Sequence, residues 1–303
     1  MASVAFVIHH DRPGAVELAK STAAWLLERG HELRFLEEDA SRVGYAGLGH
    51  PEERLAESAD VAVSFGGDGT MLRTVDLVSD RQVPVIGVNL GQLGYLTEVE
   101  PAHLQDALAR FLAGEHSIEE RMRLAVTVET VEPSATAEPS VTAEPGGSRP
   151  EPGRLTFPAL NEAVVEKTPS GHTVRLAVVV DGEFFTTYAT DGLIVATPTG
   201  STAYAFSARG PIVSPRHRAL LLTPVSPHML FDRTLVLDPG SSIRLEVLAD
   251  RPAAVAVDGR NVGLLHEGDA VVCEEASCPA RVVTFGSRSF LGILKRKFGL
   301  NDR

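Results

Sequence analysis

The sequence predicts an N-terminal α/β half followed by a mostly antiparallel β half. Up to residue 115, short apolar runs alternate with segments of helical spacing, which is typical of a parallel sheet covered by helices on both faces. Further along, strand-like runs follow one another with few helices between them, and Asp181-Gly182 separates two runs as a strong hairpin turn signal. A glycine-rich pentapeptide, residues 66–70, stands where a strand of the first half meets a helix.

The first half contains regularly alternating elements. Gly30 ends the first helix, and Pro101 is suited to the first turn of the last one. We expect strands at 4–9, 33–36, 60–65 and 83–88, and helices at 15–28, 71–78 and 101–113.

The second half reads as strands with one unusual interruption. Residues 132–153 repeat a Thr-Ala-Glu-Pro unit and contain no Leu, Ile or aromatic residue. Such a segment cannot bury enough apolar surface to offset its ordering entropy, so we expect a disordered loop there with no catalytic role. The expected strands are 123–131, 155–168, 173–180, 183–190, 243–248, 253–258 and 270–275.

Composition limits the possible functions. The chain has 303 residues, 44% of them hydrophobic, and no apolar stretch of membrane-spanning length. A net charge of −12 argues against a general nucleic-acid binder. The apolar run after Met1 lacks a preceding basic region and is expected to be a strand rather than a signal peptide. Cys273 and Cys278 have no partners for a zinc site, so we expect free thiols and a cytoplasmic protein without a membrane partner.

The pentapeptide Gly66-Gly67-Asp68-Gly69-Thr70 is the most informative motif. Glycines at a strand-to-helix turn allow the backbone to approach a phosphate, and the helix N-terminus offers free N–H groups to an anion. Asp68 is unusual there, because a carboxylate repels phosphate unless a metal intervenes or the carboxylate acts as a base. The alternative is an ordinary acidic turn.

A second group of polar residues lies in the β-rich half. Residues 190–204 are dense in glycine and small hydroxyl residues and end at an apparent helix start, which could bind a sugar or phosphate. Asn161-Glu162 precedes a strand, and an amide beside a carboxylate can bind adenine edges or ribose hydroxyls. Taken singly, each of these residues is more often a cap or turn residue.

Together these motifs resemble the NAD kinase family over most of the chain. The glycine-rich pentapeptide is shared with lipid kinases and phosphofructokinases, whereas Asn-Glu, Thr-Asp-Gly and the segment 197–204 are more specific. The matching segments are 66–73, 87–89, 91–96, 161–162, 190–192, 199–204 and 258–259.

The resemblance implies a Rossmann-like α/β domain over 1–115, a β-rich NAD-binding domain over 116–278, and a segment, 279–303, that returns to the first domain. It implies transfer of a phosphoryl group from ATP, or from polyphosphate, to the adenosine 2′-hydroxyl of NAD, with Mg²⁺ or another divalent cation. Asp68 would be the proton acceptor. The expected binding residues are Gly66, Gly67, Gly69, Thr70, Arg73, Asn161, Glu162, His172, Asp191, Thr202, Ala203, Tyr204, Ala205, Phe206 and Ser207.

This chain departs from the family pattern at two positions. Arg209 stands where the family usually has the first of two glycines, and Arg260 follows Asp258-Gly259 in place of glutamine. A non-glycine residue at a positive φ costs roughly 1–2 kcal/mol. A long cation near the NAD pocket could also block it or attract another phosphate.

Two other functions are left open by the residues. The chain could be a related kinase for a lipid or a sugar, although the segment 197–204 argues for an adenosine substrate. It could also be a dinucleotide sensor without activity, as Arg209 and Arg260 suggest, although a sensor has no need for Asp68. By resemblance, we expect a homodimer or homotetramer.

Overall fold

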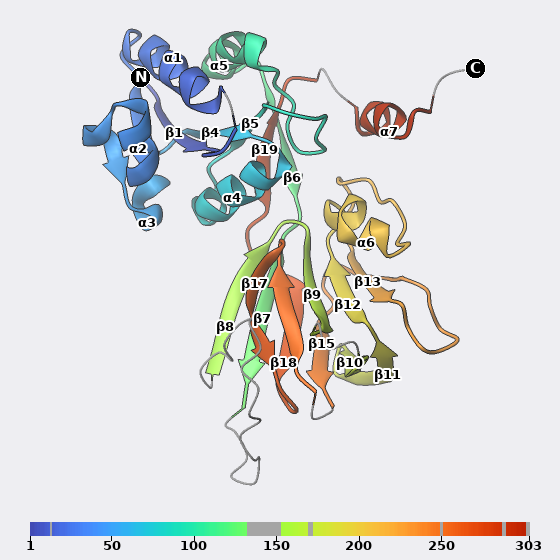
Figure 1. Ribbon diagram of the computed structural model, residues 1–303. Coiled ribbons are helices and arrows are strands. Elements are labelled where there is room, and N and C mark those ends of the chain that lie inside the picture. Colours follow the sequence, from blue (N-terminus) through green and yellow to red (C-terminus); the bar gives the residue numbers. More distant parts are fainter. Residues whose placement is uncertain (13, 132–152, 169–171, 249–250, 287–288, 301–303) are drawn as a thin grey trace. The chain divides into compact units, whose positions relative to one another are not determined.

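The computed structural model describes residues 1–12, 14–131, 153–168, 172–248, 251–286 and 289–300 (Figure 1). The chain forms two compact units, one made of Met1–Arg121 with Cys278–Arg303 and the other of Met122–Ser277. The loop expected to be disordered, 132–153, lies outside the described residues except for Gly153.

A seven-stranded sheet forms the centre of the first unit, in the order β3-β2-β1-β4-β5-β19-β6. All neighbouring strands are parallel except β6, which runs antiparallel to β19, so the sheet is mixed rather than purely parallel. The strands are β1 (Ser3–Ile8), β2 (Glu32–Leu36), β3 (Gly49–His50), β4 (Val61–Gly66), β5 (Val85–Asn89), β6 (Ser117–Arg121) and β19 (Ala280–Thr284).

Helices pack on both faces of this sheet (Figure 1). Apolar residues of α1 and α5 share one core cluster with Phe6, Phe35 and Phe65, and the ring of Phe6 contacts the rings of the other two. Met71 and Val75 of α4 are buried outside that cluster. The helices are α1 (Ala15–Leu27), α2 (Glu37–Val43), α3 (Glu52–Leu55), α4 (Asp68–Val78), α5 (Leu104–Leu112) and α7 (Phe290–Phe298), with 3₁₀ turns η1 (Ala46–Leu48), η2 (Ser79–Arg81) and η3 (Pro101–His103).

The topology of this sheet places a binding crevice between β1 and β4. The chain passes from β1 to β2 on one side, and β4 returns on the other side of β1. In an open α/β sheet, ligands bind at such a switch point, outside the carboxyl ends of the strands. The loop after β1 and the glycine turn after β4 therefore lie at one edge of the sheet.

The second unit consists of two six-stranded sheets in which all paired strands are antiparallel. Its core draws apolar side chains from both sheets, including Val126 and Leu176 from one and Val165 and Leu193 from the other. One sheet has the order β11-β10-β15-β18-β7-β8 and the other β14-β13-β12-β9-β16-β17. The strands are β7 (Leu124–Thr130), β8 (Gly153–Ala159), β9 (Glu162–Lys167), β10 (Val174–Val180), β11 (Glu183–Thr190), β12 (Gly192–Ala196), β13 (Leu220–Val225), β14 (Leu235–Leu237), β15 (Ile243–Val247), β16 (Ala253–Val257), β17 (Arg260–Leu265) and β18 (Ala270–Glu275).

One expected strand was wrong and one expected turn is confirmed. The segment 155–168 is not a single strand but two, β8 and β9, which belong to different sheets. The chain breaks between them because Leu160 and Asn161 donate their backbone N–H groups to the distant Asp258. The turn between β10 and β11 has positive φ at Asp181 (52°) and Gly182 (80°), as a type I′ hairpin requires.

Candidate functional site

The glycine-rich pentapeptide lies at the junction of β4 and α4, as the sequence predicts. Gly66 is the last residue of β4, Gly67 caps α4, and Asp68 is the first residue of that helix. A Cβ on Gly66 would lie 2.0 Å from the hydroxyl oxygen of Thr70, so only glycine lets the first helical turn pack this closely on the strand.

The carboxylate of Asp68 is held by backbone groups of a distant loop. Its Oδ2 accepts the N–H of Tyr95 at 2.8 Å, and its Oδ1 accepts the N–H of Leu96 at 3.1 Å. A Cβ on Gly94 would lie 2.2 Å from Asp68 Oδ1, so this loop can approach only because residue 94 is glycine. Asp68 is therefore fixed in one orientation.

A cavity of about 340 Å³ opens where the chain leaves β1 and β4. Its wall includes Gly67, Gly69 and Thr70 of the glycine turn and the side chains of Arg12 and Arg73. The Thr70 hydroxyl is buried and, among the described residues, has no hydrogen-bond partner. Two guanidinium groups, a free hydroxyl and the positive end of α4 make this cavity suited to an anion.

Arg12 is a functional candidate that the sequence analysis missed. Its Nη1 donates to the carbonyl of Leu90 at 3.0 Å, and a Cβ on Gly91 would lie 1.8 Å from that nitrogen. Arg12 thus links the loop after β1 to the loop that holds Asp68. Its place in the loop after the first strand was the only signal in the sequence.

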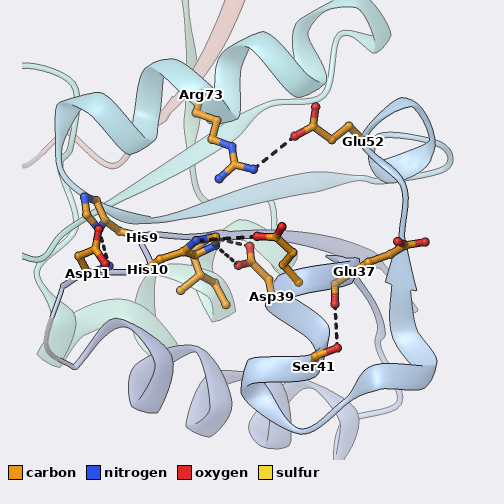
Figure 2. A network of polar contacts seen from close by, with 10 residues as sticks. His9, His10, Asp11, Glu37, Asp39, Ser41, Glu52 and Arg73 are labelled. Carbon is orange, nitrogen blue, oxygen red and sulfur yellow. Dashed lines mark hydrogen bonds and ion pairs between the residues drawn. The ribbon is translucent and has the colours of Figure 1, made fainter.

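Figure 2 shows a polar network beside this cavity. His10 Nε2 lies 2.8 Å from Oδ1 of Asp39, which is buried and also accepts the backbone N–H of Ile8 at 3.1 Å. Burial raises the pKa of Asp39 above its ordinary value, while these hydrogen bonds oppose that shift. Arg73 Nη2 pairs with Glu52 Oε1 at 3.3 Å (Figure 2).

In the second unit, Asp258 organises the start of β9. Its carboxylate accepts the N–H groups of Leu160 (2.7 Å), Asn161 (2.8 Å) and Glu162 (3.0 Å). Burial and the charge of Asp258 raise the pKa of Glu162 to about 8, although the backbone N–H of Tyr204 donates to it. The sequence analysis named Asp258 as part of a motif but did not expect this role.

The polar segment after β12 packs directly on this group. A Cβ on Gly200 would lie 2.1 Å from the carbonyl oxygen of Asn161, and Thr197 donates its hydroxyl to the Leu160 carbonyl at 2.6 Å. The chain then forms a 3₁₀ turn, η4 (Gly200–Thr202), and a single helical turn, α6 (Tyr204–Ser207). The predicted residues Thr202, Tyr204, Ala205, Phe206 and Ser207 lie on these two turns, and the predicted Ala203 joins them.

The two remaining predicted residues of this unit, Asp191 and His172, lie in different surroundings. Asp191 follows β11 and pairs with Lys167 Nζ at 2.8 Å, and its charge helps to raise the pKa of Tyr204, after burial as the main cause. His172 is exposed just before β10, and no contact within the described residues joins it to the others. The structure thus brings Asn161, Glu162 and Tyr204 together. The charge of Asp191 acts on Tyr204, whereas His172 is not part of this group.

Arg209 and the two cysteines were also singled out in the sequence. Arg209 has a φ of 67° and is exposed at the end of α6. Neither Cys273 nor Cys278 forms a disulfide within the described residues, and burial raises the pKa of the Cys273 thiol to about 12. Within the described part of the chain, no group of three or more His, Cys, Asp or Glu side chains could hold a metal ion. In the same residues, no helix is both long and apolar enough to cross a membrane.

Comparison with known proteins agrees with this architecture. Residues 4–116 match the model of the ATP-NAD kinase N-terminal domain, and residues 160–285 match that of the C-terminal domain. The NAD kinase of Heliobacterium modesticaldum is 39% identical over 98% of both chains. That of Moorella thermoacetica is 37% identical over 98% of this chain and 89% of its own.

Two solved structures share the fold. Yeast NADH kinase, solved with NADH, has a TM-score of 0.84 at 23% identity, covering 100% of this chain and 89% of its own. An NAD kinase from Archaeoglobus fulgidus, solved with ATP, has a TM-score of 0.69 at 24% identity, covering 98% of this chain and 97% of its own. The matches to both domain models and to relatives more than 30% identical over nearly the whole chain show that the chain belongs to the NAD kinase family.

Proposed function

We propose that this protein transfers the γ-phosphoryl group of ATP to the adenosine 2′-hydroxyl of NAD and so forms NADP. The observation that carries the proposal is the fixed carboxylate of Asp68 next to the anion cavity. Asp68 precedes Gly69 and Thr70, which line that cavity with Arg12 and Arg73. The names of the relatives support the same reaction.

In this reaction Asp68 accepts the proton of the 2′-hydroxyl. The hydroxyl oxygen forms a bond to the γ-phosphorus while the bond between that phosphorus and the β–γ bridging oxygen breaks, leaving ADP. Phosphoryl transfer depends mainly on positioning and charge stabilisation. The N–H groups of Tyr95 and Leu96 position the Asp68 carboxylate, and Arg12 and Arg73 offset the charge of the phosphates.

We assign the NAD substrate to residues of the second unit. Glu162 has a buried carboxyl oxygen without a partner among the described residues, and this atom is available to a ribose hydroxyl. Tyr204 is partly exposed and offers a ring for stacking on a base. Asn161 and Asp191 provide further polar contacts, and the role of His172 stays a prediction.

A divalent cation, Mg²⁺ or a similar ion, fits the residues present only if the substrate phosphates supply most of its ligands. No carboxylate cage exists in the described residues, and Mg²⁺ usually binds through substrate phosphates and one or two carboxylates. Asp68 and the Thr70 hydroxyl are the oxygen groups at the glycine turn that suit it. When bound, the ion supplies charge neutralisation on the transferred phosphate.

The test is a coupled assay for NADP formation with NAD, Mg²⁺ and either ATP or polyphosphate. We expect Asp68→Asn to lower kcat about 100-fold or more, since general base catalysis contributes typically 10²–10⁴-fold. Asp106→Asn is the matched control, because Asp106 is an exposed acidic residue in the first turn of α5. Undiminished turnover in Asp68→Asn would remove Asp68 from the mechanism, and saturable NAD binding without any turnover would favour the sensor.

We also propose that the protein is a cytoplasmic homodimer or homotetramer. Phe184 and Phe185 of β11 are exposed, and Phe185 contacts the ring of Phe231 with centroids 5.8 Å apart. Exposed aromatic side chains of this kind favour burial against another chain. Light scattering on the purified protein would contradict this proposal if it gave the mass of a single chain.

A further inference from the structure

Backbone hydrogen bonds hold the loop that orients Asp68 chiefly at its two ends. At the start of the loop, the N–H of Leu90 donates to the last carbonyl of β4 at 2.8 Å. At its end, the N–H of Glu98 donates to a carbonyl of β5 at 3.2 Å. Between these ends, the backbone of 91–94 makes no hydrogen bond within the described part of the chain. The middle of the loop therefore depends on side-chain contacts for its position.

Tyr95 is the residue of this loop at which such a contact meets Asp68. The Tyr95 N–H donates to Asp68 Oδ2 at 2.8 Å, and the Tyr95 side chain is partly exposed. Lys297 of α7 places its Nζ 4.2 Å from the centroid of the Tyr95 ring. A cation over an aromatic face is attracted by the negative potential of the ring. One residue thus separates the Lys297 ammonium from the carboxylate of Asp68.

The sequence of α7 is suited to presenting Lys297 to this ring. The Ser289 hydroxyl caps the helix by accepting the N–H of Gly292 at 3.0 Å, and Gly299, with a φ of 61°, ends it. Ile293 is buried, and Lys297 follows it by four positions, so the two side chains share one face of the helix. The face of α7 that packs on the protein therefore carries Lys297.

A second contact joins the same C-terminal segment to the loop. Phe285, just after β19, donates its N–H to both carboxyl oxygens of Glu98, at 3.3 and 3.4 Å. Arg110 of α5 lies over the Phe285 ring, 5.0 Å from its centroid. β19 itself pairs with β5, the strand that leads into the loop. The C-terminal segment thus contacts the loop at both Glu98 and Tyr95.

We propose that Lys297 is a positioning residue for phosphoryl transfer. It holds the Tyr95 ring, so that the Tyr95 N–H keeps the Asp68 carboxylate in the orientation that accepts the proton. This inference rests on the proposed function, in which Asp68 is the base. Lys297 does not line the anion cavity, so it acts on kcat rather than on the binding of ATP.

The experiment measures NADP formation by Lys297→Met with NAD, ATP and Mg²⁺. Methionine keeps most of the length and apolar character of the lysine stem but not its charge. We expect kcat to fall about fivefold, the factor that corresponds to a cation–π contact at an exposed site, with the KM for ATP unchanged. Lys297→Arg places a cation over the same ring and restores kcat.

Two further measurements distinguish positioning from a merely structural role. In the Asp68→Asn background, Lys297→Met no longer lowers the residual kcat, because no carboxylate base is left to orient. With Asp68 intact, Lys297→Met speeds amide hydrogen exchange in the peptide 90–98 but not in β1. An equal loss of kcat in both backgrounds would overturn the inference.

Arg296→Met is the matched control. Lys295, Arg296 and Lys297 all lie in the last turn of α7, where a helix favours cations, but of these three only Lys297 lies over a ring among the described residues. Arg296→Met should therefore leave kcat and exchange unchanged. A normal kcat in Lys297→Met, or a loss that Lys297→Arg does not restore, would overturn the inference. Absence of NADP from the wild type would refute the proposed function. Hydrogen exchange would then still decide whether Lys297 holds the loop, and unchanged exchange would overturn that role.

Discussion

Asp258 and Glu162 are joined by two reciprocal hydrogen bonds, while the charge of Asp258 disfavours a charged Glu162. Asp258 Oδ1 accepts the N–H of Glu162 at 3.0 Å, and the N–H of Asp258 donates to the Glu162 carbonyl at 3.0 Å. The pKa of Glu162 therefore rises from 4.5 to about 8, first through burial and then through the charge of Asp258. At neutral pH, Glu162 carries a proton and can donate a hydrogen bond.

This shift predicts a specific dependence of stability on pH. Between pH 4.5 and about 8, the folded chain keeps the Glu162 proton that the unfolded chain has lost. Stability therefore falls as pH rises through this window, by at most about 1.4 kcal/mol per pH unit. We expect Glu162→Gln to remove this slope and to be more stable than the wild type above pH 8, measured by urea unfolding at several pH values. An unchanged slope would show that Glu162 ionises normally.

Gly94→Ala is expected to impair activity far more than stability. The added Cβ would lie 2.2 Å from Asp68 Oδ1, so the carboxylate or the loop must move. A displacement of this size can lower kcat about 100-fold, whereas the strain costs about 1–3 kcal/mol. Gly47→Ala is the control, because a Cβ there meets nothing within 4 Å. Normal kcat in Gly94→Ala would mean that the orientation of Asp68 is unimportant.

Arg209→Gly is expected to stabilise the protein. Arg209 has a φ of 67°, a conformation that costs a non-glycine residue roughly 1–2 kcal/mol. Glycine removes this strain from the folded state, but it also gives the unfolded chain more conformational entropy, which lowers the free energy of unfolding. The net gain in stability is therefore about 1 kcal/mol or less. Arg209→Lys keeps the strain and should leave the melting temperature unchanged. A separate change in the KM for NAD, seen in Arg209→Gly but not in Arg209→Lys, would show that the charge acts on the substrate.

Gly200→Ala tests the packing of the polar segment on Asn161. Its Cβ would lie 2.1 Å from the Asn161 carbonyl oxygen, which belongs to backbone and cannot swing away. We expect a loss of about 3 kcal/mol or more, together with loss of NAD binding. Gly240→Ala has open space around its Cβ and should unfold at the wild-type urea concentration. Unaltered stability of Gly200→Ala would contradict this close contact.

Local patterns predicted much of the fold because they depend on neighbouring residues. The junction of β4 and α4 follows from an apolar run before glycine and helical spacing after it. The turn at Asp181-Gly182 follows from the residues that tolerate positive φ. The elements that were expected are therefore of the right type in both units, although α2, β13 and β17 were not expected and neither was the break between β8 and β9.

The missing part of the site depends on contacts between residues far apart in sequence. The Asp68 carboxylate accepts a hydrogen bond from the N–H of Tyr95, 27 positions away. The Asp258 carboxylate accepts one from the N–H of Leu160, 98 positions away. A carboxylate that binds backbone N–H groups leaves no pattern at its partners, because every residue except proline has such a group. The ligand roles of the predicted residues stay predictions until they are measured.

The sheet order of the first unit has a consequence for synthesis on the ribosome. Among the described strands, β6 (Ser117–Arg121) is hydrogen-bonded only to β19 (Ala280–Thr284), which lies between β6 and β5. During translation, β6 therefore has no strand partner until residues 122–277 have been synthesised. These residues can fold as the second unit before the first sheet is complete. A chain truncated after Arg121 would leave β6 without a strand partner and β5 as an open edge, and such unpaired strands promote aggregation.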